Sequence, residues 1–175
     1  MTVLTSPQRP NPARQAGKKL GKNQRKGWLV LHIVSAGAWI GMDLVMAVLV
    51  FTAMWTSDPL IASLCYQVLE FVTVWPMLIS GLLCLISGVV LGLGTKYGLV
   101  RYWWVAVKLV LNVVLCVLVL IALRSGVQEA AEYGRTMSGP APSGMVFPPI
   151  VSTLSLLFAT FVSVFKPWGR FRKAL

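Results

Sequence analysis

The chain carries, at residues 28–54, the uninterrupted stretch WLVLHIVSAGAWIGMDLVMAVLVFTAM. Its 27 residues include only two ionisable side chains, His32 and Asp43. A helix needs about 20 predominantly apolar residues to cross the hydrocarbon core of a bilayer. We therefore predict a membrane-spanning helix here, because backbone groups in lipid must find their hydrogen bonds within the segment.

Three further segments have the same character. Residues 71–94 and 149–165 contain no charged side chain, and residues 102–123 contain only Lys108. We predict an all-α, polytopic membrane protein with four transmembrane helices in an up-down bundle, which together form one membrane domain over residues 28–165. Residues 1–27 are predicted to be a disordered basic tail, and residues 166–175 a second basic tail.

The composition excludes several other classes of protein. The chain of 175 residues is 57% hydrophobic and only 12% charged, with a net charge of +11. With glycine included, the apolar share is about two thirds, against about 45–50% in soluble domains. A soluble domain, a disordered chain and a disulfide-stapled module are therefore excluded. The positive charge suggests nucleic acid, but so apolar a chain argues against such a partner.

The distribution of charge predicts the topology. Bases without acids occupy the tail before the first span, the loop after the second and the tail after the fourth, whereas all the acids outside the spans lie in the other two loops. By the positive-inside rule, both termini are cytoplasmic. We expect a multi-pass protein of the bacterial inner (plasma) membrane, whose basic tails contact anionic lipid headgroups.

Two connecting segments are less regular in pattern. Residues 59–70 have helical spacing of apolar side chains, and they either lie flat on the outer surface or extend the second span outward. Residues 125–147 include a stretch rich in glycine, proline and serine at 138–144, and we predict an irregular loop.

Three ionisable side chains lie inside the predicted spans, where such groups are functional candidates by default. His32 and Lys108 both lie roughly 6–9 Å below the cytoplasmic boundary, counted along their helices. The imidazole can bind haem iron axially or move protons near neutral pH. Lys108 and Asp43 are candidate catalytic groups. Interfacial placement of His32 and snorkelling of Lys108 toward the membrane surface are the alternatives.

The spacing of polar residues predicts a weakly polar bundle interior. His32, Ser35, Trp39 and Asp43 share one face of the first span, and Asn112 on the third is predicted to bond to Asp43. Small residues on the spans are expected to serve helix packing or permit a homo-oligomer. The other interior polar residues are predicted to be Thr73, Ser80, Ser87, Ser152, Ser155 and Ser163.

Three short motifs point to a family. They are His32-x6-Trp39-x-Gly41, then Trp75-Pro76-Met77 with Gly81, and Trp104-x3-Lys108-Leu109. Over residues 28–123 this pattern resembles the four-helix membrane proteins that include the HemJ-type protoporphyrinogen oxidases and the CopD-like domains. It looks closest to a group of bacterial integral membrane proteins with no assigned activity.

The resemblance implies haem b as a cofactor, with His32 as a ligand of the haem iron, Lys108 as a functional partner and Met77 beside the haem. The oxidases carry a Pro-Arg segment and a second histidine after the first-helix glycine, where this chain has Met42-Asp43-Leu44-Val45. That departure argues against protoporphyrinogen oxidase activity.

Three functions remain open from the sequence. The first is a haem-binding or redox-linked membrane protein that uses His32 and Lys108. The second is a small transport or proton-relay component that uses Asp43. The third is a structural or regulatory membrane partner without chemistry of its own.

Overall fold

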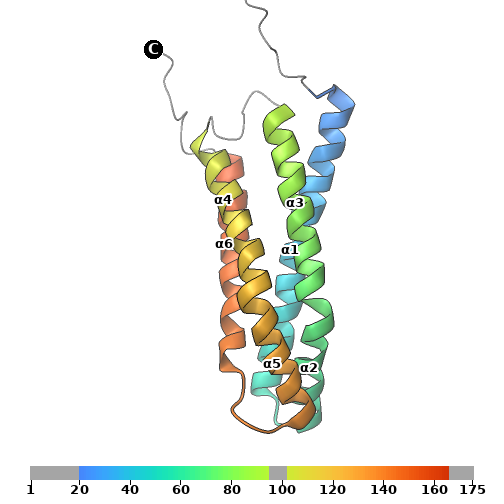
Figure 1. Cartoon of the computed structure of the whole chain (residues 1–175), viewed down its shortest axis with the longest axis vertical. Helices are drawn as coiled ribbons and strands as arrows, with labels where there is room; N and C mark the ends of the chain where they lie inside the picture. The colour runs from blue at the N-terminus through green and yellow to red at the C-terminus, as the bar shows by residue number, and fades with distance from the viewer. Residues whose placement is uncertain (1–19, 95–101, 166–175) are drawn as a thin grey trace, which may run out of the picture.

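The computed structural model describes residues 20–94 and 102–165, and these residues form helices without strands. Figure 1 shows the helices side by side along the long axis of the molecule. In chain order they are α1 (Lys22–Trp55), α2 (Pro59–Val72), α3 (Val74–Gly94), α4 (Trp103–Leu118), the π-helix η1 (Val119–Leu123), α5 (Arg124–Thr136), the 3-10 helix η2 (Ser143–Val146) and α6 (Phe147–Phe165).

Four helical segments are long and apolar enough to cross a membrane, which confirms the four predicted spans as helices. They cover Lys22–Trp55, Pro59–Gly94, Trp103–Thr136 and Ser143–Phe165. Each is longer than its predicted span, because helix continues beyond the apolar core at one or both ends. Their length and composition are those of a multi-pass membrane protein.

Helix α1 begins six residues before the predicted boundary. The Gln24 side chain accepts a hydrogen bond from the backbone N–H of Gly21 (3.1 Å), which satisfies one of the unpaired donors at the helix start. Residues 22–27 are therefore helical. The remaining parts of the predicted basic regions, residues 1–19, 95–101 and 166–175, lie outside the described residues.

Residues 59–70 extend the second span, which answers the question that the sequence left open. The Asp58 carboxylate accepts a hydrogen bond from the Leu60 backbone N–H (2.8 Å), and Pro59 occupies the first turn of α2. Only Thr73 separates α2 from α3. We attribute that break to Pro76, which lacks an N–H and crowds the carbonyl four residues earlier.

The prediction of an irregular loop over residues 125–147 is wrong. Helix α5 covers residues 124–136, and within the described residues only 137–142 separate it from η2. The helix buries a narrow stripe of small side chains: Val127, Ala130, Ala131 and Gly134. This stripe packs against α2, so tertiary contact stabilises a segment whose own sequence is strongly polar.

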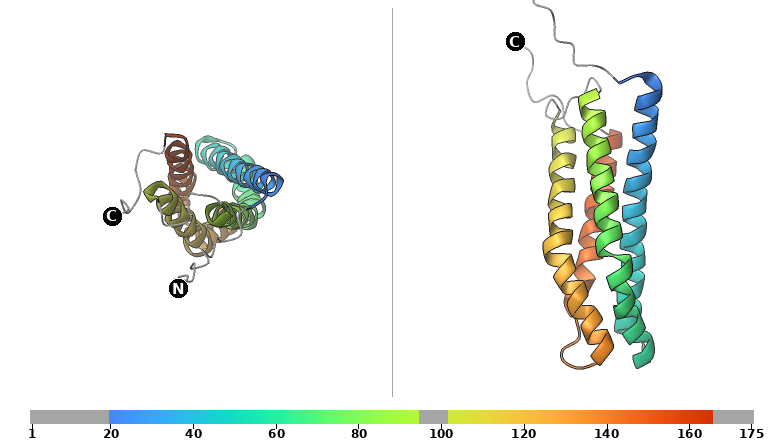
Figure 2. Two further views of the ribbon diagram at one scale, coloured as in Figure 1. Left: turned by 90° about the horizontal axis from the view of Figure 1, so that it is seen from above. Right: turned by 45° about the vertical axis from the view of Figure 1, so that its right-hand side comes forward.

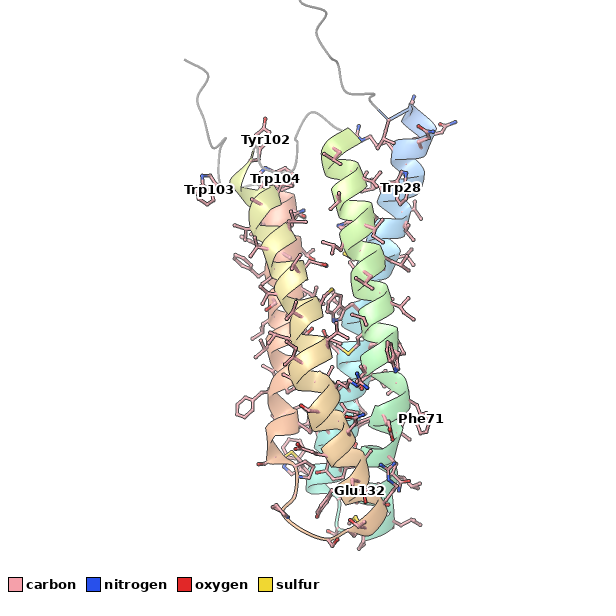
Figure 3. The ribbon with its side chains drawn as sticks, in the orientation of Figure 1. Trp28, Phe71, Tyr102, Trp103, Trp104 and Glu132 are labelled. Atoms are coloured by element: carbon pink, nitrogen blue, oxygen red, sulfur yellow. The ribbon has the colours of Figure 1, made fainter. Side chains whose placement is uncertain are left out.

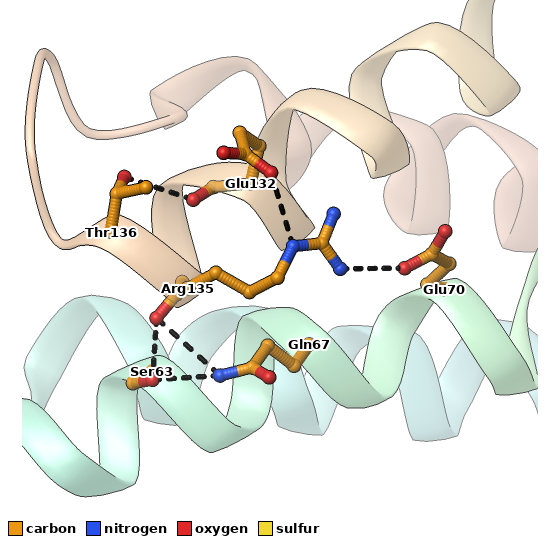
Figure 4. A network of polar contacts seen from close by, with 7 residues as sticks. Ser63, Gln67, Glu70, Glu132, Arg135 and Thr136 are labelled. Carbon is orange, nitrogen blue, oxygen red and sulfur yellow. Dashed lines mark hydrogen bonds and ion pairs between the residues drawn. The ribbon is translucent and has the colours of Figure 1, made fainter.

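Helices α2 and α5 approach each other closely at one end of the molecule (Figure 4). The Ser63 hydroxyl and the Gln67 amide both donate to the backbone carbonyl of Gly134, at 2.5 and 3.4 Å. Arg135 forms ion pairs with Glu70 (3.1 Å) and Glu132 (3.0 Å). A Cβ at Gly134 would lie 2.8 Å from the Ser63 carbonyl oxygen, so only glycine permits this contact.

The helices enclose one apolar core. The view from above in Figure 2 shows how they are grouped around it. Helix α1 packs against α2, α3 and α6, and α4 packs against α3 and α6. At the α1–α3 contact the Trp39 ring occupies the space where Gly81 would carry a Cβ. The largest buried apolar side chains include Trp39, Met46, Leu69 and Met77.

The outer surface of the helices is strongly apolar. Val34 is 62% exposed, Leu44 65%, Ile121 70% and Leu154 62%, and they come from three different spans. A soluble monomer rarely exposes a continuous apolar patch larger than a few hundred Å². The surface is therefore suited to contact with lipid.

Candidate functional site

The predicted polar face of α1 is confirmed. Ser35, Trp39 and Asp43 are buried, and His32 is half-buried at the start of the same face. These positions follow one another at three- and four-residue steps, so their side chains project in one direction from the helix. The face therefore supplies polar groups to the interior of the bundle.

Asp43 lies in the interior and has no exposed surface. One carboxylate oxygen, Oδ2, accepts a hydrogen bond from the Ser152 hydroxyl of α6 (2.7 Å). The other, Oδ1, is buried and has no hydrogen-bond partner among the described residues. Within the same part of the chain, Asp43 forms no ion pair, because the only two ion pairs involve Arg135.

The predicted hydrogen bond between Asn112 and Asp43 is wrong. The Asn112 side-chain oxygen instead accepts from the Cys116 thiol one turn along α4 (3.7 Å). Asp43 is 12 residues from the end of α1 at Trp55, about 18 Å, whereas Asn112 is 24 residues from the end of α5, about 36 Å. Counted from these helix ends, the two residues lie at different depths in the bundle.

His32 contacts helix α3. Its Nδ1 lies 3.0 Å from the backbone carbonyl oxygen of Cys84 and 3.1 Å from the Ser87 hydroxyl oxygen. A carbonyl oxygen only accepts, so Nδ1 carries the proton and, in the neutral ring, Nε2 carries the lone pair. The ring also lies close to Gly88, where a Cβ would be 3.2 Å from the imidazole.

Lys108 contacts residues of α4 and α6. Its ammonium donates to the Ser163 hydroxyl of α6 and lies 4.8 Å from the centre of the Trp104 ring. Trp104 lies near the same end of the molecule as Trp28, as Figure 3 shows. His32 and Lys108 are predicted to act together, but their hydrogen bonds go to different helices. The imidazole contacts α3, and the ammonium contacts α6.

Met77 is buried in the core, with 2% of its surface exposed. It precedes Ser87, the partner of His32, by ten residues of α3, which is about 15 Å along the helix. The structure therefore gives Met77 and His32 different depths in the bundle.

Sequence reasoning identified Asp43 but not its partner. Ser152 was predicted only as one of several polar interior residues, although it forms the sole hydrogen bond that Asp43 makes within the described residues. The contact joins residues 109 positions apart, on α1 and α6. A signal could be found by counting residues from one end of the bundle, since Asp43 lies about three turns before the end of α1 and Ser152 about two and a half turns after the start of η2.

Comparison with known proteins gives no relative. No family model matches the chain, and searches of curated proteins and of solved structures give no match.

Proposed function

We propose that this chain is a multi-pass protein of the bacterial inner membrane in which Asp43 takes up and releases a proton. Its four spans run up and down, and both termini are cytoplasmic. The positive-inside distribution of charge supports this orientation. Aromatic side chains at one end, Trp28, Tyr102, Trp103 and Trp104 in Figure 3, suit a membrane interface.

One observation carries the proposal: Asp43 is fully buried, and one of its oxygens has no partner among the described residues. An ionised carboxylate in an apolar interior costs several kcal/mol unless it is paired with a cation. Among the residues that the structure describes, Asp43 has one neutral hydroxyl as partner and no cation. The carboxyl group is therefore suited to take up and release a proton, as intramembrane acids in proton relays do.

The test is proton flux into liposomes that contain the purified full-length chain and a pH-sensitive dye. We expect Asp43→Asn to abolish flux, because the amide keeps the shape and the hydrogen bond to Ser152 but cannot exchange a proton. Asp43→Glu should retain part of it. Glu132→Gln, at an exposed acid bonded to Arg135, is the matched control and should leave flux unchanged. Equal flux through wild type and Asp43→Asn, or none through folded wild-type protein, would sink the proposal.

A second candidate function, binding of haem b at His32, is favoured by the hydrogen bond from Nδ1 to the Cys84 carbonyl. Metal-binding histidines characteristically donate their other ring N–H in this way, which directs Nε2 toward the metal. The imidazole would therefore suit as a group that holds the haem. Met77 does not fit as a ligand of the same iron, because it lies about 15 Å further along α3.

Haem would supply one-electron chemistry, and His32 would hold it. We expect the purified protein, supplied with haem, to show a Soret band that His32→Ala removes. Met77→Leu should leave the band in place, since that side chain lies at another depth. A protein that stays colourless after incubation with haem would exclude this candidate and leave the role of Asp43 untouched.

A further inference from the structure

A cavity of about 430 Å³ lies near the end of the molecule where α5 meets η2. Its walls come from α3, α4, η1, α5, η2 and α6, so every span except α1 contributes to it. Most of its lining is apolar, including Met77, Leu118 and Val151. Only two lining side chains, Ser152 and Glu129, bring a hydroxyl or a charge.

Ser152 connects the cavity to Asp43. The serine lines the cavity wall and its hydroxyl donates to Oδ2 of Asp43 (2.7 Å). One hydroxyl group thus separates the cavity from a fully buried carboxyl group that has a second, unpartnered oxygen. Behind the inner wall of the mostly apolar cavity there is therefore a carboxyl group, Asp43, that would be stabilised by a nearby positive charge.

Glu129 brings a second carboxylate to the cavity. It is exposed on α5 and forms no ion pair with any residue in the described ranges, whereas Glu70 and Glu132 both pair with Arg135. An unpaired carboxylate beside an apolar, partly dehydrated surface attracts a cation more strongly than one in open water. The cavity consequently has two acidic groups, one on its wall and one behind it.

The π-helix η1 forms part of the wall. Ala122 and Leu123 lie within it and Leu118 directly precedes it, and all three line the cavity. A π-turn inserts an extra residue into a helix, which changes the direction of the side chains that follow, and such turns are frequent at functional sites. Leu118, Ala122 and Val151 are exposed, so this part of the wall can be reached from outside the protein.

We propose that this cavity binds an amphipathic monovalent cation, an ammonium or phosphonium ion with a bulky apolar body. The apolar body lies against Leu118, Val151 and Met77, and the charge faces Glu129. A neutral apolar molecule would leave the Glu129 carboxylate uncompensated, and an anion would be repelled by it. The proposal goes beyond the function assigned to Asp43, because it requires no proton transfer.

The experiment measures binding of radiolabelled tetraphenylphosphonium to the full-length chain in nanodiscs of uncharged phosphatidylcholine, with empty nanodiscs subtracted. We expect saturable binding that Glu129→Gln weakens about tenfold, since a charged contact is worth about 1.5 kcal/mol or more. Glu132→Gln, one turn along α5 and absent from the cavity wall, should bind as wild type. Radiolabelled tetraphenylborate, which has the same shape and the opposite charge, should show no saturable binding when it is measured alone in the same way.

A second variant tests the cavity without changing charge. Ala122→Phe places a ring in the cavity from an exposed position, so it should fold and abolish binding. Wild-type affinity in Glu129→Gln or in folded Ala122→Phe, saturable binding of tetraphenylborate alone, or no saturable binding of tetraphenylphosphonium to wild type would each overturn the proposal. If proton flux depends on Asp43 but tetraphenylphosphonium does not bind, the cavity proposal is overturned and the proposed function of Asp43 stands. If tetraphenylphosphonium binds saturably but no Asp43-dependent proton flux is seen, the proposed function of Asp43 is overturned and the cavity proposal stands.

Discussion

Two buried polar atoms lie one turn apart on α1 without hydrogen-bond partners among the described residues. They are Nε1 of Trp39 and Oδ1 of Asp43. Each such atom costs about 1–3 kcal/mol, in folds whose net stability is about 5–15 kcal/mol. Sequences depart from the rule of satisfied polar groups mainly at functional positions. A functional role for this face of α1 therefore explains the two unpartnered atoms better than a contribution to stability does.

The hydrogen bond from Ser152 should contribute measurably to stability. We expect Ser152→Ala to lower the free energy of unfolding in detergent by about 1 kcal/mol, because it leaves the Asp43 carboxyl group without its partner. The measurement is denaturant unfolding followed by tryptophan fluorescence. Ser155→Ala, at a half-buried serine of the same helix, is the control and should change little.

A double-mutant cycle isolates that interaction. In an Asp43→Ala background, Ser152→Ala should cost nothing further, because the acceptor is already absent. An equal loss in both backgrounds would mean that the serine stabilises α6 by packing and not through Asp43.

At the residue scale, the sequence predicts which side chains point inward but not which of them meet. The four-residue spacing of Ser35, Trp39 and Asp43 predicts their common face, and the structure confirms it. The partner of Asp43 depends instead on which helices are neighbours and where each one ends. Asn112 shares a face of the third span with Lys108, yet its side-chain oxygen accepts from Cys116, and it is Ser152 of α6 that bonds to Asp43.

At the scale of the element, α5 shows why a helix can escape prediction. Its 13 residues are mostly polar, and an isolated helix of that length is marginal in water. The segment becomes stable because its narrow stripe of small residues fits against α2, an element distant in the sequence. By contrast, the four spans are predictable because lipid leaves the backbone no alternative to helix.

The contact between α2 and α5 should depend on Gly134 far more than on the ion pairs beside it. We expect Gly134→Ala to lower the free energy of unfolding by about 1–3 kcal/mol, because the new Cβ would lie 2.8 Å from the Ser63 carbonyl oxygen. Glu70→Gln should cost no more than about 1 kcal/mol, since the Arg135 and Glu70 side chains are 47% and 39% exposed. Chemical unfolding of both variants gives the comparison.

Gly37→Ala is a control for the glycine substitution itself, because no atom lies within 4 Å of its new Cβ. It should leave stability unchanged or raise it slightly, since alanine is the better helix former. A larger loss in Glu70→Gln than in Gly134→Ala would mean that charge pairing, not close packing, holds α2 and α5 together.

At the scale of the whole molecule, a membrane environment accounts for both the positive net charge and the apolar surface. The chain has 16 basic and 5 acidic residues, yet its described surface is dominated by exposed aliphatic side chains. Such a surface suits lipid, and in the proposed topology the excess of basic residues would orient the spans. The net charge of +11 therefore requires no nucleic-acid partner.

The orientation can be tested with single cysteines. Cys65, Cys84 and Cys116 form no disulfide, so all three can first be replaced by serine or alanine. In that background we expect Ser138→Cys, exposed between α5 and η2, to react with a membrane-impermeant maleimide in intact spheroplasts. Ser6→Cys, in the basic leading segment, should react only after lysis, because moving so many Lys and Arg side chains across the membrane is unfavourable. The opposite pattern would reverse the topology and place Glu129 and the cavity on the cytoplasmic side, so that cations would reach the cavity from the cell interior.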